Sequence, residues 1–323
     1  MKVITMLGSL PWSEDDLKKE YYRDVNNVNN RIKELPGYLI HRELDLLYLS
    51  LEIFRSSVYE LFDSIEEFIN ESDKPGFWDR PFQEYAYQVE LAIQRGMFAS
   101  TVSALSLVSH CNKFIDQFSI SNFEERKNET FVSCELHAFI HSFRRYVSHI
   151  RMAKADWHTT ISFLQETKET RFRISQEQLL RFKEWKSIAK KMIKNSPNGV
   201  DIKFTFEKYL EKINKFYSWF FNQAKKDYET HLKEYRNYDT LIKGFDSYSN
   251  WNLLINQIFL PKKIDPYIYL PKYLNKEELN EILALERNSK EQVDKIIQIL
   301  DEYKACDEKL RRAIYKLFKV KGN

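Results

Sequence analysis

The sequence contains few of the residues that build loops and turns. Its 323 residues include only seven glycines and eight prolines, which argues against a β-sandwich or an α/β enzyme with glycine-rich loops and favours long helices. A phosphate-binding loop, a dinucleotide fingerprint and a Gly-x-Ser-x-Gly element are all missing. These absences leave kinase, dehydrogenase and esterase functions without support.

Cysteines and long apolar runs are scarce as well. Three cysteines, odd in number and far apart at positions 111, 134 and 306, are typical of a reducing compartment. No uninterrupted apolar run reaches about 18 residues, and the first ten residues are too short and too weakly charged for a signal peptide. We therefore expect a cytoplasmic protein with no membrane span.

What the sequence does contain is the composition of a globular protein, with 43% hydrophobic and 30% charged residues. Apolar residues at spacings of three and four predict long helices over 38–70, 82–118 and 202–242. The alternating and β-branched stretch near 157–174 predicts a small β-hairpin. The predicted fold class is all-α: an up-and-down helical bundle with a small β-hairpin insertion and helical extensions at both ends.

The chain is expected to divide into three parts, at Pro36-Gly37 and at a segment with several prolines after residue 245. Residues 1–37 are expected to form an N-terminal helical extension, residues 38–245 the bundle, and residues 246–323 a C-terminal helical extension. In the last part, helices are expected to begin at about Lys276 and Ser289.

Charge is distributed unevenly along the predicted bundle. Residues 43–73 contain nine acidic residues and one arginine, whereas residues 141–194 contain thirteen arginines or lysines and five acidic residues. A basic region of this kind can bind a polyanion. The alternative is a solvated helix face, or a surface on which the acidic 43–73 segment docks without any chemistry.

Histidine and arginine are concentrated in residues 136–151. On a helix that turns about 100° per residue, the apolar residues share one side: Phe139, Ile140, Phe143, Tyr146, Val147 and Ile150. The polar residues are expected on the other side: His137, His141, Arg144, Arg145 and Ser148, with His149 at its border. Packing in a core explains the apolar side but not this unusual polar side.

These residue types suit the chemistry of RNA cleavage. Arginine provides a permanent cation that binds phosphate oxygens, and histidine transfers protons near neutral pH. RNA carries its own nucleophile, the 2′-OH, beside the phosphate that is cleaved. A histidine that moves protons and an arginine that stabilises the pentavalent phosphorane would therefore suffice without a metal.

The segment Phe143-Arg144-Arg145-Tyr146-Val147-Ser148-His149 resembles the Arg-x(4–6)-His motif of the HEPN superfamily, and is most similar to the branch that reads Leu-Arg-Asn-Tyr-x-x-His. The resemblance is specific over these seven residues, and the helical pattern extends over roughly 38–195. One position departs from the family: Arg145 stands where Asn, Asp or His is usual.

The resemblance implies a metal-independent endoribonuclease of a bacterial toxin or antiphage-defence system, with no cofactor and no metal. It implies that Arg144 and His149 are catalytic, and that two chains pair through the motif face into a homodimer. The substrate would be RNA, and an antitoxin or defence-system protein would be the partner. Four further residues are expected to bind the substrate: Arg145, His141, Ser148 and Arg151.

Two other interpretations remain open. The same basic face could bind RNA, a nucleotide or a partner protein without catalysis. Cys134, His137 and His141, at spacings of three and four, could instead share a zinc ion, although no second Cys or His cluster is nearby in the sequence.

Overall fold

The structure is a computed structural model. It describes residues 32–72, 74, 76–77, 79–149, 156–162 and 167–320, with the backbone alone for 148–149, 156–162, 167–170, 241 and 245. The described residues form two compact units, one within residues 40–228 and one within residues 32–39 and 229–320. The bounds expected from the sequence were 38 and 245.

The larger unit is helical with one small sheet, so the predicted all-α fold with a β-hairpin insertion is confirmed. Its helices are α4 (Pro36–Ser72, which begins before residue 40), α5 (Gln83–Gln117), α6 (Phe123–Phe131), α7 (Glu135–His149), α8 (Gln176–Arg181), α9 (Ser187–Lys194) and α10 (Ile202–Asp227), with a 3-10 turn, η1, at Arg80–Phe82. Its strands are β1 (Asp156–Ser162), β2 (Thr167–Ile174) and β3 (Val200–Asp201).

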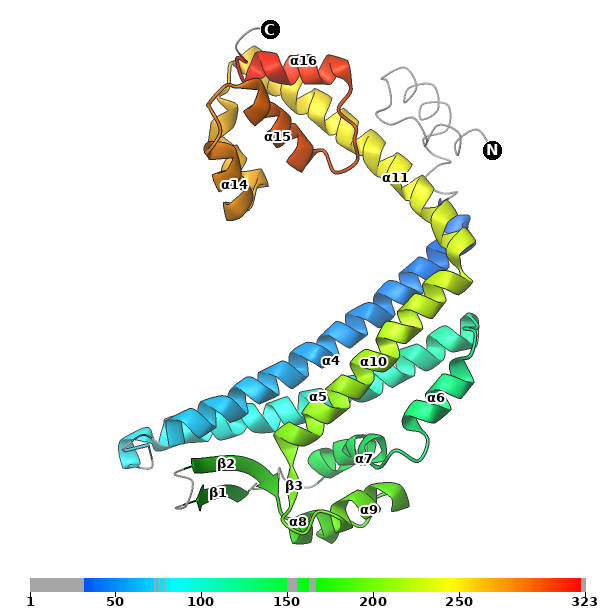
Figure 1. Ribbon diagram of the computed structural model, residues 1–323, viewed down its shortest axis with the longest axis vertical. Helices are drawn as coiled ribbons and strands as arrows, with labels where there is room; N and C mark the ends of the chain where they lie inside the picture. The colour runs from blue at the N-terminus through cyan, green and yellow to red at the C-terminus, as the bar shows by residue number, and fades with distance from the viewer. Residues whose placement is uncertain are drawn as a thin grey trace. The chain divides into compact units, whose positions relative to one another are not determined.

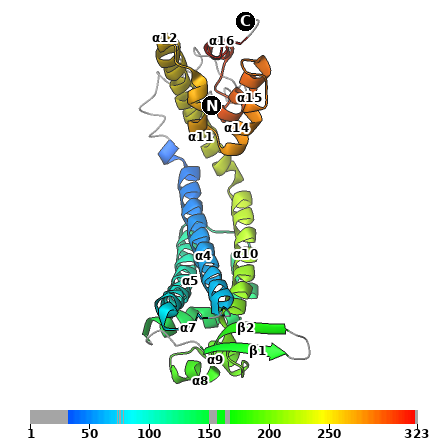
Figure 2. The ribbon, with the colours of Figure 1, turned by 90° about the vertical axis from the view of Figure 1, so that its left-hand side faces the viewer.

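Helices α4, α5 and α10 run beside one another (Figures 1 and 2). Small residues of α5 allow a close approach to α4: a Cβ at Gly96 would lie 3.0 Å from Cα of Leu61, and the Ser100 hydroxyl donates to the Ser57 carbonyl at 2.9 Å. Asp201 caps the start of α10, and its side chain accepts a hydrogen bond from the Phe204 N–H at 3.0 Å. Most aromatic side chains of α10 are buried in the core, whereas Trp219 and Phe221 are half-buried and Phe204 is exposed.

Segment Arg80–Gln117 is long and apolar enough to cross a membrane, judged by length and composition alone. The expectation from the sequence counted uninterrupted apolar runs, and serine and threonine interrupt this one. Core helices of globular proteins share this composition, and the face of α5 that contains Gly96, Ala104 and Leu107 is buried within the unit. The segment is therefore weak evidence for a membrane.

The sheet and the short helices lie at one end of the α4–α5–α10 bundle (Figure 2). Strands β1 and β2 pair antiparallel over the predicted hairpin, with Asp156 opposite Arg173 and Ser162 opposite Thr167. Strand β3, which the sequence did not predict, pairs with the end of β2. Helix α7 packs against both α5 and α9, so its environment comes from segments before and after it in the chain.

Two expected helices are each divided in the structure. The helix predicted over 202–242 is interrupted at Tyr228, between α10 and α11 (Glu229–Asn252). The spacing of Ser121 and Glu124 is that of a capping box and predicts one helix from there through the histidines, yet α6 ends at Phe131 and α7 begins separately at Glu135. Ser133 lies between them with φ of 61°, a left-handed conformation that no helix continues through.

The second unit, described over residues 32–39 and 229–320, has its own apolar core. After α11 come the π-helical turn η2 (Leu253–Phe259), α12 (Leu260–Lys262), the 3-10 turn η3 (Pro266–Ile268), α13 (Leu270–Tyr273), α14 (Lys276–Leu283), α15 (Lys290–Leu300) and α16 (Glu308–Leu317). The starts predicted at about Lys276 and Ser289 are confirmed: Asn275 and Glu278 form a capping box, and Ser289 caps α15. Ile282, Val293, Leu310 and Ile314 belong to the buried core.

Candidate functional site

Helix α7 carries the predicted site, and its apolar side is anchored by stacked aromatic rings. Phe139, Phe143 and Tyr146 are buried, as the sequence predicted. The ring of Trp185, which precedes α9, stacks on Phe139 at 5.4 Å and on Tyr146 at 5.6 Å. This packing fixes the rotation of α7 about its axis and therefore the direction of its other faces.

Arg144 and Arg145 are exposed on the outer side of α7. Among the described side chains, no carboxylate forms an ion pair with either arginine. Two adjacent guanidinium groups that pair with none of the described carboxylates can bind an external anion. Ser148 and His149 are the last two residues of α7; their side chains, and all of Arg151, lie outside the described residues.

Two histidines of α7, His137 and His141, do not share the exposed surface of the arginines. His137 and His141 are half-buried, and their ring centroids lie 4.1 Å apart. His137 also packs on Phe131 of α6, at 4.6 Å between centroids, and its Nδ1 lies 3.2 Å from the Tyr209 hydroxyl of α10. Because α7 contacts α10 as well as α5 and α9, it buries part of the side that the sequence placed in solvent.

Burial determines the charge of this histidine pair. Desolvation, followed by repulsion from His141, Lys186 and Lys212, lowers the pKa of His137 to about 3. Desolvation and Lys186 lower the pKa of His141 to about 4. Both imidazoles are therefore neutral at pH 7, and His141 does not offer the positive charge expected of a phosphate ligand. Its Nε2 is buried and has no hydrogen-bond partner among the described protein groups.

The low pKa values predict that acid destabilises this unit. An unfolded histidine binds a proton near pH 6.5, whereas His137 and His141 remain neutral in the folded unit until about pH 3 and 4. Below pH 6.5 the unfolded state thus binds more protons, and the free energy of unfolding should fall by about 2 kcal/mol per histidine between pH 7 and pH 5.

Urea unfolding at pH 7 and pH 5 measures this effect. In a His137→Gln/His141→Gln double variant, the difference in stability between the two pH values should be smaller than in the wild type, and each single variant should remove part of it. An unchanged difference in the double variant would show that other groups cause the acid sensitivity.

A basic groove lies next to the histidine pair, between α6, the start of α7 and α10. Its volume is about 530 Å³. The charged residues that line it are Arg126 and Glu129 of α6 with Lys208, Glu211, Lys212 and Lys215 of α10. Each carboxylate forms a salt bridge with a neighbouring cation, Glu129 with Arg126 at 3.2 Å and Glu211 with Lys208 at 3.1 Å. The groove therefore has an excess of positive charge.

Sequence reasoning did not identify this groove, because its two sides are about 80 residues apart in the chain. The available signal was the spacing of Lys208, Lys212 and Lys215, which places three cations on one face of a helix. No group of three His, Cys, Asp or Glu residues in the described part of the chain is arranged to hold a metal ion. The zinc alternative with Cys134, His137 and His141 therefore has no geometric support.

Comparison with known proteins adds no family to this picture. No protein-family model, curated protein or solved structure matches the chain.

Proposed function

We propose that this protein is a metal-independent endoribonuclease of the HEPN type. The observation that carries the proposal is the pair of exposed arginines, Arg144 and Arg145, with no carboxylate partner among the described side chains, shortly before His149 at the end of a helix anchored by its aromatic side. Permanent cations and an imidazole that can transfer protons are the components that RNA transesterification needs.

In the proposed reaction, His149 removes the proton from the ribose 2′-OH, and the 2′-oxygen attacks the adjacent phosphorus. The bond between phosphorus and the 5′-oxygen breaks, and the leaving oxygen receives the proton that His149 took from the 2′-OH. The products are a 2′,3′-cyclic phosphate and a 5′-hydroxyl end. Arg144 stabilises the negative charge of the pentavalent phosphorane, and Arg145 holds a neighbouring backbone phosphate together with Ser148 and Arg151.

The half-buried histidines receive different roles in this proposal. A neutral His141 contributes hydrogen bonding and packing, so the cationic contacts come from the arginines. The basic groove with Lys208, Lys212 and Lys215 is a surface on which the flanking RNA backbone can lie. The resemblance to HEPN domains adds a homodimer through the motif face, a cytoplasmic location and an antitoxin or defence-system partner.

The proposal is tested by incubating the full-length protein with total RNA, with and without EDTA, and analysing the new ends. We expect fragments with 2′,3′-cyclic phosphate ends in equal amounts with and without the chelator. Fragments that EDTA abolishes, or fragments with 3′-hydroxyl ends, would contradict the mechanism.

A second candidate is RNA binding without cleavage, which the excess positive charge of the groove favours. In that case the RNA stays intact, and a gel shift weakens steeply as salt concentration rises, because phosphate binding releases counterions. Lys212→Gln and Lys215→Gln would then lower the affinity for RNA, and no RNA fragments would form with or without EDTA.

A further inference from the structure

The unit of residues 32–39 and 229–320 contains a cavity where several short elements end. Its volume is about 470 Å³, within the range of sites for small organic ligands. Residues from the end of η2, from α12, η3, the loop before α15 and the end of α16 line it. We call it the α12–α16 pocket, and its main residues are Phe259, Lys263, Tyr267, Arg287, Lys316 and Lys319.

The charged groups of the α12–α16 pocket are mostly positive. Four basic side chains line it, and the one acidic side chain among its lining residues is Asp265. Asp265 is neutralised by Arg287, whose Nη2 lies 3.2 Å from its carboxylate. Among the described residues, no acidic side chain pairs with the three exposed lysines. The pocket therefore has an uncompensated charge that would attract an anion with several negative charges.

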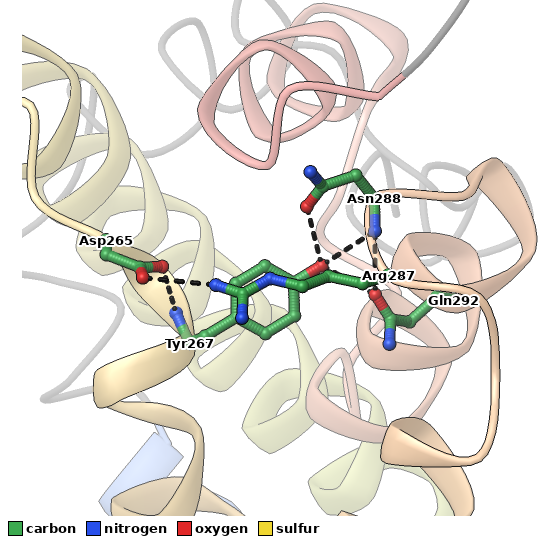
Figure 3. Close-up of polar contacts among 5 residues, drawn as sticks. All are labelled: Asp265, Tyr267, Arg287, Asn288 and Gln292. Carbon is green, nitrogen blue, oxygen red and sulfur yellow. Dashed lines mark hydrogen bonds and ion pairs between the residues drawn. The ribbon is translucent and has the colours of Figure 1, made fainter.

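Arg287 is held in place before any ligand arrives, as Figure 3 shows. Its guanidinium lies over the Tyr267 ring, 4.2 Å from the centroid. The Tyr267 hydroxyl donates to Oε1 of Gln292 at 2.5 Å and accepts from the Asn288 N–H at 3.0 Å. Because the arginine loses little side-chain freedom on binding, more of its interaction with an anion contributes to affinity.

The backbone around the pocket adopts an uncommon conformation at three positions. Lys263, Asn288 and Lys319 have positive φ values of 51°, 64° and 54°, which residues other than glycine seldom adopt. Glycine or asparagine is the usual residue at such helix ends, yet two of these positions carry lysine. Residues with rare backbone conformations cluster at functional sites, which agrees with a ligand pocket.

The rest of the lining is apolar. Pro266, Leu317 and Phe318 are buried and line the pocket together with Phe259 and Leu260. A free inorganic anion would leave this surface without a partner. A ligand with an aromatic ring next to its phosphates would cover both the apolar and the cationic part.

We propose that the α12–α16 pocket binds a nucleotide, with its phosphates on Lys263, Arg287, Lys316 and Lys319 and its base on the apolar wall. The site belongs to the second unit and does not depend on RNA cleavage by α7. It gives the chain a small-molecule ligand in addition to the proposed substrate.

Isothermal titration of the full-length protein with ATP, adenosine and tripolyphosphate tests the proposal. We expect ATP to bind, tripolyphosphate to bind more weakly and adenosine to show no measurable binding. No binding of ATP would overturn the proposal, and equal affinity for ATP and tripolyphosphate would overturn the role of the base. If an RNA oligonucleotide displaces ATP at a concentration lower than that of ATP, the pocket binds nucleic acid, and the nucleotide proposal is overturned.

Variants locate the site. Lys263→Gln and Lys316→Gln change exposed side chains, and each should weaken ATP binding about tenfold, the effect of losing one charge-assisted hydrogen bond; Arg287→Gln should weaken it at least as much. Lys290→Gln is the matched control, because it removes one exposed positive charge from the same unit outside the pocket. If the Lys263, Lys316 and Lys290 variants bind ATP with equal affinity, the assignment of the site to the α12–α16 pocket is overturned.

Discussion

Replacing Arg144 with alanine is expected to lower the rate of RNA cleavage by about 10² to 10³-fold, the usual effect of removing one group that stabilises a transition state. Replacing His149 should lower it by about 10² to 10⁴-fold, because proton transfer to and from the reacting oxygens is lost. Arg144 is exposed, so its truncation removes no core packing. Initial rates with an end-labelled RNA measure both effects.

Two further variants separate chemistry from general loss of charge. Arg144→Lys keeps the positive charge but loses the planar pair of donors, so it should recover only part of the rate. Arg181→Ala removes an exposed arginine of the same unit that pairs with Glu177 at 2.7 Å, and should cleave like the wild type. The ribonuclease assignment is wrong if Arg144→Ala and His149→Ala, with unchanged helical circular dichroism, also cleave at the wild-type rate.

Replacing Gln292 with leucine is expected to destabilise the second unit by about 4 kcal/mol. Gln292 is buried, with 1% of its surface exposed. Its Nε2 donates to the carbonyls of Ile282 and Leu285 at 2.9 and 3.3 Å, and its Oε1 accepts from Tyr267 and from the Asn288 N–H. Leucine has a similar size but offers no donor or acceptor, so the Leu285 carbonyl loses its bond from Gln292, while the Ile282 carbonyl retains the one from the Leu285 N–H.

Hydrogen exchange measures this effect within the unit, because amide protection in α14, α15 and α16 reports local opening. Gln298→Leu is the matched control: it makes the same chemical change at an exposed position of the same helix. Protection should fall strongly in the Gln292 variant and little in the control. Similar protection in the two variants would mean that the hydrogen bonds of Gln292 contribute little.

The helices of this protein were predictable because the signals that form them are local. Apolar residues at spacings of three and four identified α4 and α5 within about two residues. The starts of α14 and α15 were predicted within about one residue. Asn275 and Ser289 cap them in the structure, and such a cap acts within one turn because its side chain satisfies free N–H groups. The hairpin was predictable for the same reason, since alternation along two neighbouring strands pairs them directly.

The candidate sites were only partly predictable. The sequence identified α7 and the apolar side that buries Phe139, Phe143 and Tyr146. It did not predict that His137 would lie against Tyr209 and His141 against His137, because a helix of this pattern can contact one neighbour or several. The basic groove and the α12–α16 pocket were missed, since each is formed by segments that lie far apart in the chain.

The amino-acid sequence by itself thus determined the class of fold and the positions of most helices, both of which depend on neighbours within a few residues. The tertiary structure alone decided which polar residues of α7 are buried, which cations share a groove and where Arg287 meets Tyr267. The physical reason is that burial and electrostatic environment arise from contacts between distant segments, and those contacts set the charge of a histidine or the strength of an anion site.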